Sequence, residues 1–192
     1  ESLNPRLTIL DTVAEPLMVQ GIGTPAEREA RVVRLLQQVG LSPAASFLFR
    51  YPHELSGGQR QRVSIARALV VIPDFVVADE PTSMLDVSVR TGVIHLMVDL
   101  AREMGLSYLY ITHDLAVARY TSEDIAVMYM GKIIERGPTE ELLANPLHPY
   151  TRALISAVPV PDPAYHREVP AIKGSISRPI DPPDYCRFYE RC

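Results

Sequence analysis

The feature that most restricts the fold of this chain is a strand–helix–strand pattern in the middle of its 192 residues. The apolar run FVVA at 75–78 precedes the acidic pair Asp79–Glu80 and predicts a buried strand. Apolar residues then repeat with helical spacing over 89–104, and Gly105 provides a stop. SYLYIT at 107–112 predicts the next strand. Because strands joined by a crossover helix pair in parallel, the chain is expected to have an α/β fold.

Other segments predict the elements on either side of this unit. TPAE at 24–27 has the pattern of a helix start with a capping box, and Gly40 is a suitable end for that helix. Residues 59–72 predict a second amphipathic helix, and the strands around Gly131 predict a hairpin. Nine of the 17 prolines fall between Pro146 and Pro183, so residues 159–185 are expected to form an extended tail.

Composition excludes several classes of protein. The formal net charge is −4, which does not suit a strongly basic nucleic-acid binder. Only two cysteines occur, so the chain is not a disulfide-stapled secreted scaffold. No apolar stretch approaches the ~20 residues that a membrane-spanning helix needs.

Polar side chains follow both strands of the strand–helix–strand unit. Asp79 and Glu80 end the first strand, and His113 and Asp114 end the second. Ligands bind beyond the carboxyl ends of parallel strands, so chemistry is expected at this edge. One carboxylate can hold a hard cation through water, and the other can activate an attacking water. The alternative is a solvated acidic turn, with His113 as an ordinary helix-entry residue.

LSGGQ at 55–59 is a more specific signal. Ser56 can cap the following helix, while Gly57 and Gly58 let a ligand approach the backbone closely. The helix start offers free N–H groups and a positive dipole end, which favours phosphate. The alternative is a capped helix with a flexible entry turn.

Four motifs in order resemble the ATP-binding cassette (ABC) transporter ATPases over nearly the whole chain: LSGGQ at 55–59, VVADE at 76–80, SMLD at 83–86 and ITHD at 111–114. The resemblance implies a partial P-loop NTPase fold with a helical subdomain, parallel core strands and a proline-rich C-terminal extension. It also implies ATP and Mg²⁺ as cofactors.

The same resemblance implies a role for each residue that matches a family motif. Glu80 would be the catalytic glutamate and His113 the switch histidine, and Asp79 would hold Mg²⁺, through water. The residues implied in binding ATP are the signature residues Ser56, Gly57, Gly58 and Gln59 and the D-loop residue Asp86.

Other segments resemble the dipeptide and oligopeptide importer branch of this family, with nickel import left open. They include residues 2–17, 51–69 and the HPYTRAL segment within 137–159. Some members of the branch carry a 4Fe–4S cluster on C-terminal cysteines, which makes Cys186 and Cys192 candidate ligands. Such a cluster normally takes four thiolates, so we expect none in this chain alone and one in a longer parent.

The phosphate-binding sequence G-x-x-x-x-G-K-[ST] does not occur in the chain. We therefore expect this to be the C-terminal portion of a longer ATPase. The expected parts are a helical subdomain over 1–72, the second half of the ATPase core over 73–137 and a peptide-importer extension over 138–192. The fragment alone should be inactive.

Family resemblance further implies the partners. They are a second ATPase subunit bound head to tail, membrane permease subunits and, indirectly, a solute-binding protein, with no nucleic acid. The expected location is the cytoplasmic face of the membrane. Two alternatives stay open: an ABC-type ATPase of DNA repair or translation, and a non-catalytic partner subunit.

Overall fold

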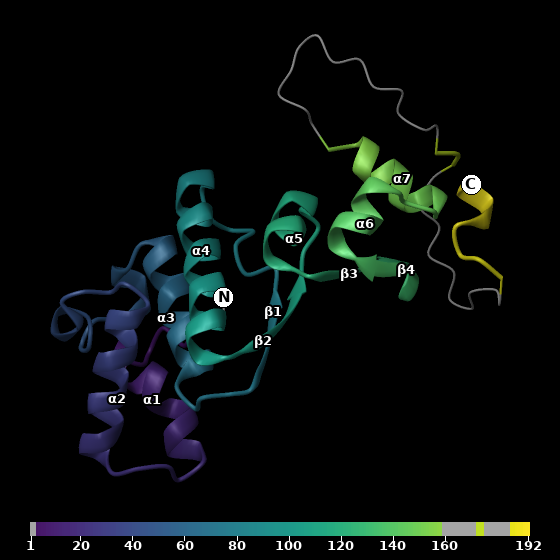
Figure 1. The fold of residues 1–192 in the computed structure, drawn as a ribbon. Coiled ribbons are helices and arrows are strands. Elements are labelled where there is room, and N and C mark those ends of the chain that lie inside the picture. The colour runs from purple at the N-terminus through teal and green to yellow at the C-terminus, as the bar shows by residue number, and fades with distance from the viewer. Residues whose placement is uncertain (1–2, 159–171, 175–184) are drawn as a thin grey trace. The chain divides into compact units, whose positions relative to one another are not determined.

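The computed structural model describes residues 3–158, 172–174 and 185–192 (Figure 1). Contacts divide the chain into two units, residues 1–111 and residues 112–192.

Helices that pack on one another form the first part of unit 1 (Figure 1). The sequence between them contains two short 3₁₀ turns, η1 and η2. The elements are α1 (Ile9–Val19), α2 (Pro25–Gln38), η1 (Ala44–Ser46), η2 (Pro52–Glu54) and α3 (Gly57–Leu69). Helix α2 begins with the predicted capping box: the Thr24 amide donates to Glu27 Oε2 at 2.7 Å, and the Glu27 amide donates to Thr24 Oγ1 at 3.4 Å. The predicted start of this helix is confirmed.

A parallel strand pair joined by a long helix completes unit 1. The elements are β1 (Phe75–Asp79), α4 (Val87–Met104) and β2 (Ser107–Ile111). The register runs from Phe75 opposite Ser107 to Asp79 opposite Ile111. Gly105 ends α4 with φ +66°, a left-handed conformation that glycine adopts without steric cost. The predicted strand–helix–strand unit is therefore confirmed.

The prediction that residues 75–78 form a buried strand was wrong for half of them. Ala78 is buried, but Val77 is 56% exposed, and Phe75, Leu109 and Ile111 are exposed as well. Successive side chains of a strand point to opposite faces of a sheet. In unit 1 the helical core covers only the face that carries Val76, Ala78, Tyr108 and Tyr110. The other face of β1 and β2 is an open apolar surface.

One hydrophobic core joins the helices of unit 1 to the covered face of the sheet. Most of its deeply buried members come from α1, α2, α3 and α4. They include Ile9, Val13, Val32, Leu36, Val63, Ala66 and Val93. This core fixes the starts of α3 and α4, where two of the sequence motifs lie.

Unit 2 contains an antiparallel hairpin with short helices. The elements are α5 (Leu115–Thr121), β3 (Asp124–Tyr129), β4 (Lys132–Pro138), α6 (Thr139–Ala144), α7 (Pro149–Ser156) and η3 (Tyr189–Arg191). The hairpin turns at Met130 and Gly131, with φ of +47° and +77°. Positive φ at both central residues is the geometry of the tight turn that matches strand twist. The predicted hairpin is confirmed.

The extended tail predicted over 159–185 falls almost entirely outside the described residues. The last eight residues do have a defined place within unit 2. Phe188 is only 2% exposed, and its ring lies 5.3 Å from that of Tyr129 and 5.4 Å from that of Tyr150. The end of the chain is thus packed onto the hairpin and α7.

Candidate functional site

The LSGGQ segment forms the start of α3. The Ser56 hydroxyl accepts from the Gln59 amide at 3.3 Å, and Gln59 Oε1 accepts from the Ser56 amide at 3.0 Å. Gly57 and Gly58 occupy the first two helical positions, where amide N–H groups have no partner within the helix. The Arg60 guanidinium donates to the Leu55 carbonyl at 2.9 Å and so steadies the entry to the helix. This helix start can bind an anion through the amides of Gly57 and Gly58.

The structure brings this helix start next to the segment that follows β1. An added Cβ at Gly57 would lie 3.6 Å from Leu85 Cδ2, and one at Gly58 would lie 2.5 Å from Val89 Cγ1. Leu85 belongs to the SMLD motif, and Val89 lies in the first turn of α4. Two motifs that are about 25 residues apart in the sequence are therefore neighbours.

Asp79 and Glu80 lie where β1 ends. Asp79 is exposed, and its carboxylate is a suitable oxygen donor for a hydrated Mg²⁺ ion. The Glu80 amide donates to the Ile111 carbonyl at 2.9 Å and so prolongs the pairing with β2 by one residue. The Glu80 carbonyl then accepts from the amide of Ser83 at 3.2 Å and from its hydroxyl at 3.1 Å, which closes a turn.

Glu80 also has an uncommon backbone conformation. Its φ is +46°, in the left-handed region where few residues other than glycine are found. Such a conformation costs of order 1 kcal/mol or more and persists only where the surroundings fix it. The bonds to Ile111 and Ser83 fix it here. Sequence reasoning identified Glu80 as a candidate but gave no signal for this conformation.

Asp86 occupies the N-cap position of α4 without using its side chain as a cap. Its carbonyl accepts from the Arg90 amide at 2.8 Å, while its carboxylate is exposed. The Arg90 guanidinium donates to the Leu85 carbonyl at 3.3 Å. The carboxylate of Asp86 is thus available for contacts outside unit 1.

His113 belongs to unit 2, just before α5, and its side chain is exposed. The neighbouring Asp114 caps α5 by accepting from the amides of Ala116 and Val117 at 2.9 and 3.3 Å. The carboxylate of Asp114 therefore acts as the N-cap of α5. The expected placement of His113 beside Glu80 stays a prediction, because they lie in different units.

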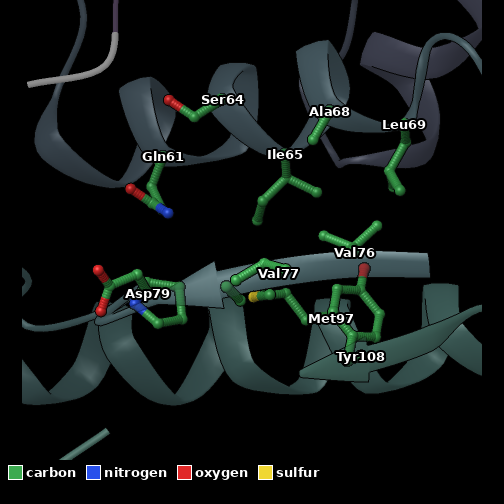
Figure 2. Close-up of a pocket in the computed structure, with 12 residues that line it drawn as sticks. Gln61, Ser64, Ile65, Ala68, Leu69, Val76, Val77, Asp79, Met97 and Tyr108 are labelled. Carbon is green, nitrogen blue, oxygen red and sulfur yellow. The ribbon is translucent and has the colours of Figure 1, made fainter. Parts of the chain in front are cut away.

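A cavity of about 160 Å³ lies between α3 and β1 (Figure 2). Figure 2 shows Gln61, Ser64 and Ile65 on one side and Val77 and Asp79 on the other. Among the described residues that line this cavity, none is Lys or Arg. The lining includes neither Gly57 nor Gly58, so the cavity is distinct from the start of α3.

Cys186 and Cys192 are both exposed, free thiols in unit 2. Cys186 Sγ lies 3.7 Å from His148 Nε2. Within the described part of the chain, no three His, Cys, Asp or Glu side chains gather in a way that would hold a metal ion. The residues present do not fit a complete 4Fe–4S site.

The HPYTRAL segment has a structural basis that sequence reasoning missed. Glu135 of β4 accepts from the Leu147 amide at 2.7 Å and from the His148 amide at 3.1 Å. His148 caps α7, because its Nδ1 accepts from the Tyr150 amide at 3.1 Å. The sequence did contain one signal for the start of α7, a histidine directly before a proline. It contained no signal that Glu135, twelve residues before Leu147, would bind this helix start.

No helix in the described part of the chain combines the length and the apolar character that crossing a membrane requires.

The sequence matches the ABC transporter family over residues 1–83 and the family described as the oligopeptide/dipeptide transporter C-terminal region over residues 134–192. It is 49% identical to the dipeptide transport ATP-binding protein DppF of Haemophilus influenzae, over 100% of this chain and 58% of that protein. It is 54% identical to the oligopeptide transport ATP-binding protein OppF of Bacillus subtilis, over 86% of this chain and 54% of that protein. The chain therefore spans less than two thirds of the length of these curated relatives.

A solved structure has the same fold. The dimeric structure of MJ0796, a bacterial ABC transporter cassette, matches with a TM-score of 0.62 and 35% identity, covering 72% of this chain and 59% of that one. A second structure of MJ0796, in a post-hydrolysis state bound to ADP and Pi, matches with the same TM-score of 0.62. The expected α/β cassette fold is confirmed.

Proposed function

The chain belongs to the ABC transporter ATPases with an oligopeptide/dipeptide transporter C-terminal region, and from this premise we propose that it is the C-terminal portion of a subunit that hydrolyses ATP to drive import of di- or oligopeptides. The observation that supports this most directly is the start of α3. There a capped helix presents the amides of Gly57 and Gly58 beside the SMLD segment. We propose the three-part division at residues 1–72, 73–137 and 138–192 for the complete protein.

In this proposal the residues of the helix start bind a nucleotide held by the second ATPase subunit. The Gly57 and Gly58 amides donate to phosphate oxygens, and the helix dipole favours the negative charge. The Ser56 hydroxyl accepts from the Gln59 amide, so its own hydrogen is free to be donated to the same phosphate. Gln59 and Asp86 complete the surface that faces the second subunit.

The residues at the end of β1 act on the nucleotide of their own subunit. Asp79 would hold a hydrated Mg²⁺ ion, which would neutralise charge on the phosphate oxygens. Glu80 accepts a proton from the attacking water. His113 donates a hydrogen bond to phosphate or holds the Glu80 carboxylate in place.

The proposed partners are a second ATPase subunit and the permease subunits, with a solute-binding protein acting through the permease. The relatives are named as peptide transport ATP-binding proteins, which supports a position at the cytoplasmic face of the membrane. A 4Fe–4S cluster on Cys186 and Cys192 would need thiolates beyond the two in this sequence. No step of the proposed cycle uses one.

The test uses the complete protein that contains this chain. Glu80→Gln should still bind ATP but hydrolyse it at least about 100-fold more slowly, because the proton acceptor is lost. Glu103→Gln is the matched control: it is an exposed glutamate near the end of α4 and should keep normal turnover. Near-normal hydrolysis by Glu80→Gln would remove Glu80 from this role.

Transport is tested in cells that lack the chromosomal copy of the gene. Uptake of a radiolabelled dipeptide and a radiolabelled tetrapeptide should be restored by the wild-type gene and not by Glu80→Gln. Normal uptake in the deletion strain, with a defect in DNA repair or translation, would favour the non-transport alternative. A wild-type protein that binds ATP but does not hydrolyse it would favour the non-catalytic partner.

A further inference from the structure

The first turns of α3 and α4 lie against each other at Gly58 and Val89. A Cβ built on Gly58 would lie 2.5 Å from Val89 Cγ1 and 3.9 Å from Val89 Cβ. Real Cβ atoms are not found as close as 2.5 Å to another carbon, so the Cγ1 methyl occupies the space of a side chain at residue 58. At Gly57 the corresponding distance, 3.6 Å to Leu85 Cδ2, is an ordinary contact.

Both helices are anchored in the core close to these residues, and Val89 itself is 38% exposed. Val89 lies one helical turn before Val93, which is fully buried, and Met97 continues the same face of α4. On the other side, Leu55 before α3 and Val63 within it are buried. Neither helix can move away freely, so the methyl of Val89 sets how closely the two first turns approach each other.

The backbone at Gly58 does not itself require glycine. Gly58 is an ordinary helical residue of α3, and positive φ is not found there. Alanine at such a position normally stabilises a helix, because glycine has the greater conformational freedom to lose. A side chain at residue 58 is therefore excluded by a neighbour or by a ligand, and the structure provides the neighbour.

We propose that Val89 is a positioning residue for the LSGGQ segment. Its Cγ1 methyl seats against Gly58 and fixes the first turn of α3, with its free amides, relative to the SMLD segment that precedes α4. Residue 58 is glycine because Val89 fills the space. That these amides bind the phosphate of a nucleotide rests on the proposed function, whereas the packing contact does not.

The contact is tested by a double-mutant cycle in the 192-residue chain, followed by urea unfolding without nucleotide. Gly58→Ala should lower the folding equilibrium constant about tenfold, because one methyl overpacks the contact. In the Val89→Ala background the same change should be neutral or stabilising, since Cγ1 is gone. Gly57→Ala is the matched control in the same turn and should be tolerated. The proposal would be overturned if Gly58→Ala lowered the folding equilibrium constant equally in both backgrounds, or in neither.

The positioning role is tested by two local measurements. Val89→Ala should speed hydrogen exchange at the amides of residues 57–60 and leave those of α2 unchanged. In the complete ATPase it should raise the KM for ATP about threefold with kcat within twofold, because misplaced amides bind phosphate less well. Val87→Ala, a 76% exposed valine on the same turn, should change neither. An unchanged KM and unchanged exchange in Val89→Ala would overturn the positioning role.

These results are separable from the proposed function. A complete wild-type protein without ATPase activity would contradict the proposed function and leave the double-mutant cycle as it is. Absence of coupling between residues 58 and 89, in a protein that hydrolyses ATP normally, would contradict only the role of Val89.

Discussion

Glu135 shows how a single carboxylate can hold a helix start against a hairpin. It accepts from the amides of Leu147 and His148, directly before α7. Partial burial raises the pKa of Glu135, but the nearby Thr151 hydroxyl, these two amides and His148 together lower it more. The net pKa of Glu135 lies below its ordinary value, so the ionised form is the one that the folded chain stabilises.

This direction sets the pH dependence of Glu135→Gln. A pKa that is lower in the folded than in the unfolded state stabilises the chain above the unfolded pKa, and the effect is lost as pH falls through the folded value. Wild type should exceed the variant by about 1 kcal/mol in unfolding free energy from pH 6 to 8. The difference should shrink below about pH 4.5. Urea unfolding followed by circular dichroism at several pH values measures it.

Glu141→Gln provides the control for the loss of one carboxylate. Glu141 is exposed on α6 in the same unit, and its substitution should leave the pH dependence of the unfolding free energy unchanged. A difference between wild type and Glu135→Gln that stays constant down to pH 3 would contradict the assignment of the effect to the ionised carboxylate.

The ends of helices and strands could be predicted from the sequence wherever neighbouring residues form a recognisable cap or stop. The capping box at Thr24 and the helix end at Gly105 were both predicted, because a cap is formed by residues close in the sequence. The burial of β1 was misjudged, because periodicity cannot say what covers each face of a strand. The packing of the last eight residues was missed for the same reason: Phe188 meets partners 38 and 59 residues away in the sequence, at Tyr150 and Tyr129.

The turn η3 and the residues before it are expected to depend on one side chain. Phe188→Ala should release residues 185–192 from the hairpin, because loss of a buried aromatic ring costs about 3 kcal/mol or more. Hydrogen exchange should then speed up at the amides of Arg191 and Cys192. Each of these donates within this segment, to Phe188 and Tyr189 respectively.

Tyr189→Ala is the matched control, because the neighbouring ring is 70% exposed. It should leave exchange at these amides near the wild-type rate. Equal acceleration in both variants would mean that the segment is held by its backbone bonds and by arginine contacts, such as that of Arg187 with the Met130 carbonyl.

The candidate site as a whole was only partly predictable. Motif order located Ser56, Asp79, Glu80 and Asp86, and the structure places the first and last of these on adjoining segments. The contact between Gly58 and Val89 was out of reach, because it depends on how two helices pack. The relation of His113 to Glu80 stays a prediction, since it spans the two units.

The purified 192-residue chain should not turn over ATP. It contains no G-x-x-x-x-G-K-[ST] sequence, so no lysine of that motif can bind the β- and γ-phosphates. Release of radiolabelled phosphate from ATP, at equal molar amounts of chain and complete protein, measures this. Steady release by the chain alone that disappears in Glu80→Gln would contradict it.

The left-handed backbone of Glu80 sets the stability of the fold against the activity of the enzyme, two properties that selection usually favours together. At φ +46° glycine is the residue that relieves strain, and one base change converts a glutamate codon into a glycine codon. On the proposed role, that variant would be more stable and unable to activate water. Directed evolution for thermal tolerance would then enrich inactive clones at this position, and a screen on growth with peptides would remove them.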